Sequence, residues 1–258
     1  MGLFDEWFQE NVEDDDQKQL MKFVEKAGGR RAIKGQLCQT IRSHYDSLDQ
    51  IADDIKRLGY KVASKVLRER LPRTKKARSG DIGEILASEL VEEKLDFEVP
   101  VRRMRYKDGR EVALRGDDFI GIRFNTKEGL WLLKGESKSR SVLAKDTIED
   151  ARSALDRYHG RCSPSSLLFV ADRLLELGGK SATLGRAIRK EVGTKTLRKK
   201  SINHALFTLS GNAPPSSLKD DLDGADSGRR QTTINIRIED HQDFIAEIYE
   251  GAGKLGKS

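Results

Sequence analysis

Two acidic residues and a lysine stand where a pair of β-strands could bring their side chains together. Asp118 precedes one apolar segment and Glu136-Ser-Lys138 follows another, with the polar stretch 125–129 between the segments. If 125–129 is a turn centred on Lys127, the numbers of residues that face each other across an antiparallel pair add up to 254. Asp118 then lies opposite Glu136, with Cβ atoms about 5 Å apart on one face. Lys138, two residues further on, points to the same face.

Two carboxylates this close need a cation between them, because like charges raise each other's pKa. A hard divalent ion with oxygen ligands satisfies both, and Mg²⁺ is the usual intracellular choice, with Mn²⁺ as an alternative. Lys138 can orient or help deprotonate the attacking water and can stabilise negative charge on a phosphate. These are the parts that phosphodiester hydrolysis requires, so the pattern predicts a metal-dependent nuclease.

Asp117 is the neighbouring candidate for the first acid. The same alternation places Asp117 opposite Ser137 on the other face, which favours Asp118, although a register shift of one residue reverses the choice. The alternative to a site is a solvated hairpin with an ordinary ion pair, since Glu-x-Lys is common by chance. Its position after the apolar residues 130–133, with an acid on the previous strand, favours the functional interpretation.

The arrangement Asp118…Glu136-x-Lys138 resembles the PD-(D/E)xK nuclease superfamily. The resemblance implies a mixed β-sheet flanked by helices, with the acid and the E-x-K on adjacent strands and the two carboxylates as metal ligands. The chain departs from the family's pattern in having Gly116, not Pro, before the acid pair. That position varies within the superfamily, so the departure puts little in doubt.

The same resemblance implies a further metal-binding glutamate on the helix before the sheet, and the segment GDIGEILASELVEE offers Glu84. We expect a helix over 80–95, capped by Ser79, with Glu84 beside small residues on the side opposite its apolar face. The apolar face consists of Ile82, Ile85, Leu86 and Leu90. An ordinary solvated glutamate at position 84 is the alternative.

The order of GDIGEILASELV, RGDDFIGIRF and GESKSR after an N-terminal helical region is similar to that of the HamA family, the nuclease subunits of the Hachiman anti-phage defence system. The resemblance spans roughly Gly80 to the C-terminus and is firmest between Gly80 and Arg140. It implies DNA as the substrate, the helicase subunit HamB as the partner, and nuclease activity restrained until the helicase senses aberrant DNA. A repair or restriction nuclease of the same fold and a non-catalytic nucleic-acid-binding scaffold subunit are the alternatives.

The elements around these residues predict an α/β fold with a mixed β-sheet core flanked by helices and an N-terminal helical region. Residues 1–78 are expected to be helical, with Pro72 ending a long helix over 41–71. We therefore expect two parts, an N-terminal helical region over 1–78 and a nuclease domain over 79–258.

Strands and helices mix in the second part. Apolar or alternating segments predict strands over 97–106, 112–124, 130–138, 166–171, 205–209 and 232–238. Apolar residues at spacings of three and four predict a helix over 148–158. The basic segment 180–200 and the segment 240–249 are also expected to be helical. The stretch 212–230, rich in Pro, Ser, Asp and Gly, predicts a long exposed loop.

The 258-residue chain has a net charge of +6 and a pI near 9.2, which favours a polyanionic partner. Lys56–Arg78 contains ten Lys and Arg residues and a single acid, Glu69, and a second basic run covers Arg186–Lys200. Either run can contact phosphates without reading sequence, serve a partner protein, or be a solvated helix face.

Several classes of protein are disfavoured. No segment approaches the roughly 18 apolar residues that cross a bilayer. Residues 1–16 carry seven acids and no Lys or Arg, the wrong charge for a secretory or transit peptide, so we expect a cytosolic protein. Cys38 and Cys162 have no Cys or His neighbours in ligand spacing, which excludes a disulfide framework and argues against a zinc site.

Overall fold

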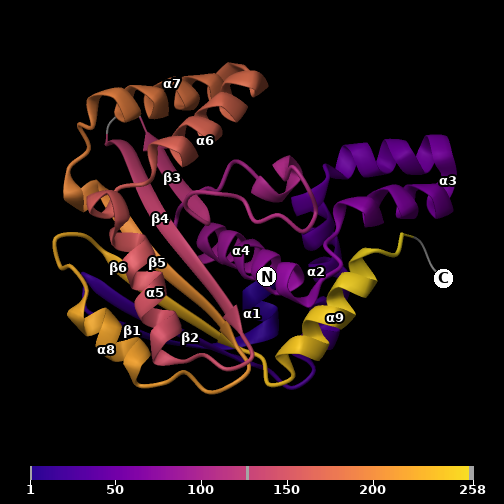
Figure 1. The fold of residues 1–258 in the computed structure, drawn as a ribbon, viewed down its shortest axis with the longest axis horizontal. Helices are drawn as coiled ribbons and strands as arrows, with labels where there is room; N and C mark the ends of the chain where they lie inside the picture. The colour runs from indigo at the N-terminus through magenta and orange to yellow at the C-terminus, as the bar shows by residue number, and fades with distance from the viewer. Residues whose placement is uncertain (1, 126–127, 256–258) are drawn as a thin grey trace.

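A six-stranded mixed β-sheet with helices on both faces forms the centre of the computed structural model, which describes residues 2–125 and 128–255 (Figure 1). The predicted α/β fold is therefore confirmed. The strands are β1 (Phe8–Asp14), β2 (Lys18–Glu25), β3 (Phe119–Asn125), β4 (Gly129–Arg140), β5 (Ile202–Ser210) and β6 (Gln231–Arg237). The helices are α1 (Leu3–Trp7), α2 (Gly29–Tyr45), α3 (Leu48–Arg70), α4 (Lys75–Lys94), α5 (Lys145–Asp156), α6 (Pro164–Leu177), α7 (Gly179–Thr194), α8 (Ser217–Gly224) and α9 (His241–Ala252). The short 3-10 helices are η1 (Arg103–Tyr106), η2 (Arg157–Gly160) and η3 (Lys199–Ser201).

The strand order across the sheet is β1-β2-β6-β5-β4-β3. The inner strands β2, β6, β5 and β4 run parallel, and the edge strands β1 and β3 each pair antiparallel with their neighbour. Helix α4 packs on one face, and α5 and α8 cover the other (Figure 1). Because helices cover both faces, β5 is buried at every residue, as is typical of a central parallel strand.

Helix α4 is the central helix of the fold and is buried on most of its surface. The four residues of its predicted apolar face are all 0% exposed: Ile82, Ile85, Leu86 and Leu90. Gly83 lies against β4, because a Cβ atom there would stand 2.7 Å from Ser137 Oγ and 3.3 Å from Ser139 Cβ. The missing side chain lets the helix approach the sheet closely and brings Glu84 beside it.

The start of α4 differs from the expectation. The helix begins at Lys75 because the Thr74 side chain accepts a hydrogen bond from the Ala77 N–H and serves as the N-cap. The expected cap, Ser79, lies within the helix, and its Oγ stands 2.9 Å from Ser139 Oγ. This hydrogen bond joins the first turns of α4 to the end of β4.

An N-terminal helical region is present in α1, α2 and α3, but the expectation that 1–78 is entirely helical is wrong over 8–25. Those residues form the hairpin of β1 and β2, and β2 pairs parallel with β6 from Lys18↔Gln231 onward. Leu20, Met21 and Phe23 of β2 are buried, so the hairpin contributes to the core of the same sheet. The division at residue 78 stays a prediction.

The apolar segment 166–171, expected as a strand, lies in α6. Pro164 occupies the first helical turn and the Ser163 side chain accepts a hydrogen bond from the Ser166 N–H, so a capped helix begins here. Periodicity alone cannot distinguish a short apolar strand from a buried helix segment, and here the cap and Pro164 favour the helix. Its buried apolar residues, at helical spacing, are Leu167, Val170, Ala171 and Leu174.

Three other segments differ from the expectation: two expected strands are much shorter, and the expected loop contains a helix. The segment 97–106 contributes one isolated bridge, Glu98↔Ile122, followed by η1. Of the expected strand 112–124, only the part from Phe119 onward is a β-strand. The expected loop 212–230 contains α8.

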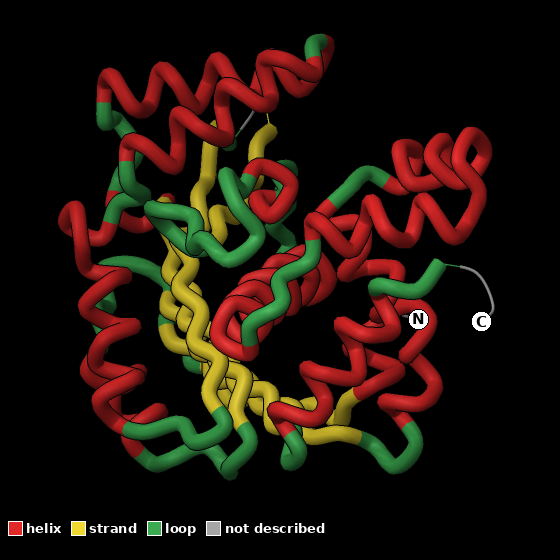
Figure 2. Tube along the Cα trace, turned by 45° about the vertical axis from the view of Figure 1, so that its right-hand side comes forward, coloured by secondary structure: helices red, strands yellow, loops and turns green. Residues whose placement is uncertain are grey.

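Helix α3 extends away from the body of the molecule (Figures 1 and 2). Gly59, with φ 75° and ψ 159°, breaks the helix, and the two arms lie side by side in both views. Left-handed φ values suit glycine, so the break falls where the sequence permits it. None of the described helices has the length and apolar character needed to cross a membrane.

Replacing Gly83 by valine is expected to lower the free energy of unfolding by about 1–3 kcal/mol, because the added side chain pushes α4 away from β4. Chemical denaturation of the purified protein measures this. Gly80→Val is the matched control, since position 80 lies on the same helix and a Cβ there meets nothing within 4 Å. Equal destabilisation by both variants would show that helix propensity, not the contact with β4, is responsible.

Candidate active site

The register of the β3–β4 hairpin is the predicted one. Facing residues run from Phe119↔Gly135 to Asn125↔Gly129, so their numbers add up to 254 throughout. The predicted centre of the turn, Lys127, lies outside the described residues. Strand β4 continues to Arg140, beyond its last β3 partner, so its final residues have no neighbouring strand on that side.

Asp118 lies directly before β3, where the pairing with β4 stops. Its Oδ2 accepts a hydrogen bond of 2.8 Å from the Ser137 backbone N–H, so the carboxylate occupies the free edge of β4 beside Glu136 and Lys138. Burial raises the pKa of Asp118; the Ser137 N–H and the positive charges of Lys138 and Arg103 oppose that rise. The residue preferred from the sequence therefore meets the E-x-K strand directly.

Asp117 does not lie where strict alternation placed it. Its Oδ2 accepts a hydrogen bond of 2.7 Å from the Ser163 N–H at the start of α6, and its Oδ1 lies 3.8 Å from Lys134 Nζ. Alternation fails here because β3 begins two residues later, so the backbone at 117 is not part of the ladder. With 6% exposure, Asp117 joins α6 to the sheet, and it is Asp118 that contacts Ser137.

Glu136 and Lys138 form an ion pair on β4, with 2.5 Å between Glu136 Oε1 and Lys138 Nζ. Their side chains are only 12% and 21% exposed. Burial raises the pKa of Glu136 to about 7, and the nearby charge of Asp118 adds to the rise, while Lys138 opposes it. The strand therefore presents a carboxylate whose ionised form is short of compensating positive charge.

Glu84 reaches the same region from α4. Burial and the charge of Asp118 raise its pKa well above the ordinary value, and Arg103 opposes the rise. Arg103 Nη1 lies 3.4 Å from Glu84 Oε2. The structure thus brings Glu84 and Glu136 each close enough to Asp118 for its charge to raise their pKa, as the sequence-based hypothesis requires.

Arg103 is a component of the site that sequence reasoning missed. Its guanidinium donates to the Asp118 carbonyl at 2.5 Å and to the Arg115 carbonyl at 3.0 Å, in addition to facing Glu84. It therefore fixes the backbone that carries Asp118 relative to α4. The segment VRRMRYKDGR is visibly basic, but nothing in its spacing tells which arginine returns to the acids.

A buried ion pair one turn before Glu84 was also missed. Lys107 Nζ lies 2.8 Å from Asp81 Oδ2, and the two side chains are 4% and 7% exposed. The Tyr45 hydroxyl donates to the same Asp81 oxygen at 2.6 Å. Asp81 thus fastens α4 to α2 and to the loop after η1, which stabilises the helix that carries Glu84.

The chemistry of these donors fits a hard divalent cation, because carboxylate oxygens are the ligands that Mg²⁺ prefers. Within residues 2–125 and 128–255, however, no three His, Cys, Asp or Glu side chains stand close enough to form a metal-ligand cluster. Glu136 faces Lys138 and Glu84 faces Arg103 instead. Metal binding would thus require the carboxylates to exchange these cationic partners for the ion.

Comparisons with known proteins agree with the family resemblance seen in the sequence. A family model described as HamA matches residues 1–252. A curated relative, the Hachiman protein HamA of Bacillus cereus, is 26% identical over 182 residues, which cover 70% of this chain and 63% of the relative. The matched part thus spans less than two thirds of that relative's length.

The raised pKa of Glu136 predicts a pH dependence of stability in metal-free protein. Folded Glu136 keeps its proton up to about pH 7, whereas its ordinary pKa is 4.5, so the free energy of unfolding should fall as pH rises between these values. The loss should amount to about 3 kcal/mol at most. Urea unfolding in EDTA from pH 4.5 to 8 measures it, with Glu136→Gln as the reference. Parallel curves for the two proteins would contradict the raised pKa.

Proposed function

This chain belongs to the HamA family, and from that premise we propose that it is a metal-dependent deoxyribonuclease acting in the Hachiman anti-phage defence system. The relative from Bacillus cereus, named as a Hachiman protein, supports the defence role. In this role the chain hydrolyses DNA phosphodiester bonds in the cytosol, with a helicase subunit, HamB, as its partner.

The observation that carries the nuclease proposal is the junction of Asp118 with β4. The Asp118 carboxylate accepts a hydrogen bond from the Ser137 N–H and lies beside Glu136 and Lys138 of β4. Glu84 approaches the same carboxylate from α4. The pKa of each of the three carboxylates is raised by burial, so their ionised forms need additional positive charge.

Each residue has a defined part in this proposal. Asp118 and Glu136 would hold the cation, Mg²⁺ or Mn²⁺, with Glu84 as a further ligand. When bound there, such an ion would polarise the phosphodiester as a Lewis acid and lower the pKa of a water molecule. Lys138 would then orient the attacking water and stabilise the negative charge that develops on the phosphate. Asp117 stays with α6 and takes no direct part.

The ion pairs also support restraint of the activity by a partner. Arg103 pairs with Glu84 and Lys138 pairs with Glu136, so in the described arrangement cations of the chain itself occupy two of the acids and offset part of their charge. Engagement of the helicase subunit or of DNA would shift the balance toward the metal-binding arrangement. A linkage of this kind requires that the partner binds the two arrangements with different affinity.

A non-catalytic nucleic-acid-binding subunit is the second candidate. It is favoured by the lack of a three-residue ligand cluster among the described side chains. A repair or restriction nuclease of the same fold has no observation of its own in its favour. A neighbouring gene for a helicase would separate the defence role from repair or restriction.

Cleavage of plasmid DNA in Mg²⁺, with and without the helicase partner, is expected to require the E-x-K residues. Glu136→Ala/Lys138→Ala should lower the cleavage rate by at least about 100-fold, since the variant lacks a metal ligand and the cationic clamp. Gel quantification of nicked and linear products measures the rate, and thermal unfolding verifies that the variant is folded. Equal cleavage by the two proteins would refute the catalytic assignment.

Removal of the metal should have a comparable effect. EDTA is expected to abolish cleavage, and Glu84→Gln should raise the Mg²⁺ concentration for half-maximal rate by about 10–100-fold. Glu92→Gln is the control on the same helix, because Glu92 pairs with Arg102 away from the site. If Glu84→Gln and Glu92→Gln have the same Mg²⁺ dependence, Glu84 is not part of the metal site.

A further inference from the structure

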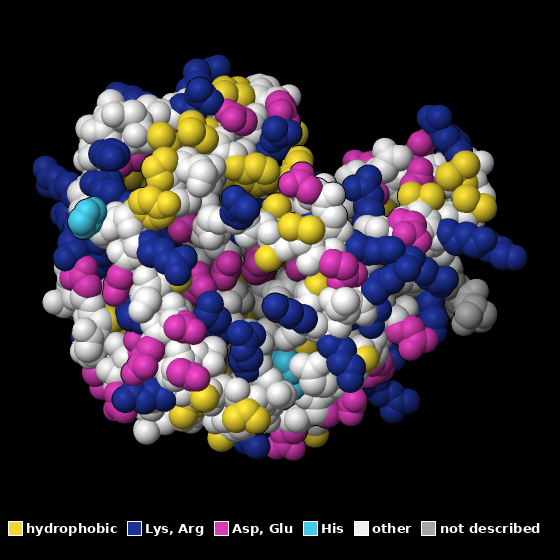
Figure 3. Space-filling view, viewed as in Figure 1, with side chains coloured by type: hydrophobic (Ala, Val, Ile, Leu, Met, Phe, Trp, Pro, Cys, Tyr) yellow, Lys and Arg dark blue, Asp and Glu magenta, His cyan; other side chains and the backbone are white. Residues whose placement is uncertain are grey.

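A basic groove lies between the end of α3, the start of α4 and α9. Its volume is about 910 Å³, and its lining includes five cationic side chains and two acidic ones, Glu69 and Glu250. The cationic residues are Lys65, Arg68, Arg73, Arg78 and Lys254. In the space-filling view, Lys and Arg side chains gather along the surface below α3, where this groove lies (Figure 3).

Two of the five cations are already neutralised within the groove. Arg73 lies 3.0 Å from Glu69, and Lys254 lies 2.6 Å from Glu250. Lys65, Arg68 and Arg78 have no carboxylate partner among the residues that the structure describes. The groove therefore keeps an excess of positive charge that an anionic ligand could neutralise.

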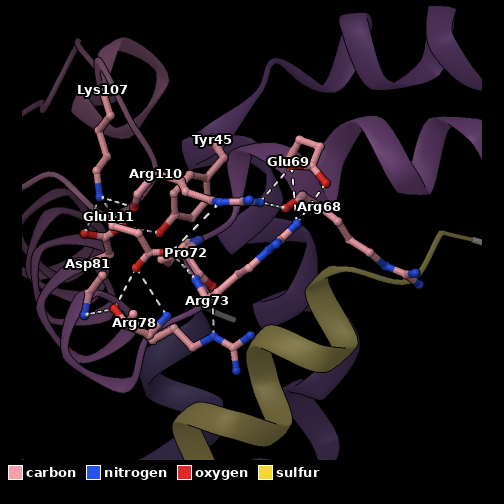
Figure 4. A network of polar contacts seen from close by, with 12 residues as sticks. Tyr45, Arg68, Glu69, Pro72, Arg73, Arg78, Asp81, Lys107, Arg110 and Glu111 are labelled. Atoms are coloured by element: carbon pink, nitrogen blue, oxygen red, sulfur yellow. Dashed lines mark hydrogen bonds and ion pairs between the residues drawn. The ribbon is translucent and has the colours of Figure 1, made fainter.

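Arg68 and Arg78 are held in a particular way. Arg68 Nε donates to the Gly253 carbonyl at 2.8 Å, and Arg78 Nε donates to the Pro72 carbonyl at 2.9 Å. In both, the two outer nitrogens make no hydrogen bond with any described residue. In Figure 4 the Arg78 guanidinium points toward α9, and the Arg68 guanidinium lies over the segment that follows α9. Two arginines fixed through Nε, with the outer nitrogens free, are prepared for bidentate contact with phosphate oxygens.

Helix α4 connects the groove to the candidate active site. Arg78 is six residues before Glu84, a distance of about 9 Å along the helix axis. Its neighbour Ser79 contacts Ser139, the residue after Lys138. The second basic run belongs mainly to α7, which packs on α6 and lies away from α3 and α9 (Figure 1).

The groove offers phosphate contacts but no platform for bases. Tyr249 is the aromatic residue in its lining, and it is 2% exposed beneath the Arg78 guanidinium, whose carbon lies 5.6 Å from the ring centre. A base cannot stack on a ring covered in this way. Contacts would therefore be made to the backbone of the nucleic acid and would be independent of its sequence.

We propose that Arg68 and Arg78, with Lys65, bind the phosphodiester backbone of DNA in this groove and guide the strand toward the carboxylates, an inference that rests on the proposed nuclease function. The run Lys56–Arg78 then contacts the substrate through these three residues. The run Arg186–Lys200 makes no contribution to this contact.

Fluorescence anisotropy with a labelled 30-base-pair duplex tests the proposal, using the full chain in EDTA so that cleavage cannot occur. Arg68→Gln/Arg78→Gln should raise the Kd at least about tenfold and flatten the plot of log K against log salt by about 2, because two phosphate contacts are lost. Arg68→Lys/Arg78→Lys should keep the salt slope but bind more weakly, since lysine lacks the bidentate fork. Arg186→Gln, an exposed arginine of the other run, should bind as the wild type does.

The two arginines also support the backbone, so Lys65→Gln provides a second test free of structural contacts. It should flatten the salt slope by about 1 with an unchanged unfolding midpoint. Wild-type protein that binds no more tightly than Arg68→Gln/Arg78→Gln, or equal weakening by Arg186→Gln, would overturn the proposal. The two proposals can fail separately. If the wild-type protein cleaves DNA in Mg²⁺ but the groove variants bind DNA normally, the nuclease function stands and the role of the groove is refuted. If DNA binding depends on the groove but the protein does not cleave DNA in Mg²⁺, the role of the groove stands and the nuclease function is refuted.

Discussion

Where α4 crosses β4, the absence of a side chain at Gly83 lets the helix lie directly against Ser137 and Ser139. Ser79 reinforces that contact with a hydrogen bond to Ser139. Because α4 is buried against the sheet, Glu84 has little freedom to move away from Asp118. The same approach aligns the first turn of α4, with Arg78, beside the end of β4. The acids and the basic groove thus take their positions from one helix–strand contact.

Electrostatics in the site are set by limited access to water. Three carboxylates share a region in which burial raises the pKa of each, and the chain compensates with Arg103 and Lys138. Asp81 beside them is neutralised by Lys107 and takes a hydrogen bond from Tyr45. Buried charges of this kind persist only when they are paired, so each cation constrains where its acid can point. The arrangement is therefore sensitive to any ligand that competes for these pairs.

The hairpin register was predictable because two apolar strands and a short turn leave one alignment that keeps each side chain on its proper face. The buried face of α4 was predictable from its spacing for the same reason. The direction of Asp117 was not, since it depends on β3 beginning at Phe119. Arg103 could not be assigned because its contact with Glu84 arises from long-range packing. Strand β1 was missed because its acidic sequence forms a sheet edge with little burial.

The order of strands has a consequence for how the chain assembles. β6, the last strand in the sequence, lies between β2 and β5, so residues 231–237 join an N-terminal hairpin to strands made much later. Until they leave the ribosome, the sheet exists at most as two separate halves with exposed inner edges. Pairing across about 200 residues closes a long loop and is slow in comparison with local contacts. Completion of the fold must therefore wait for the C-terminal part of the chain.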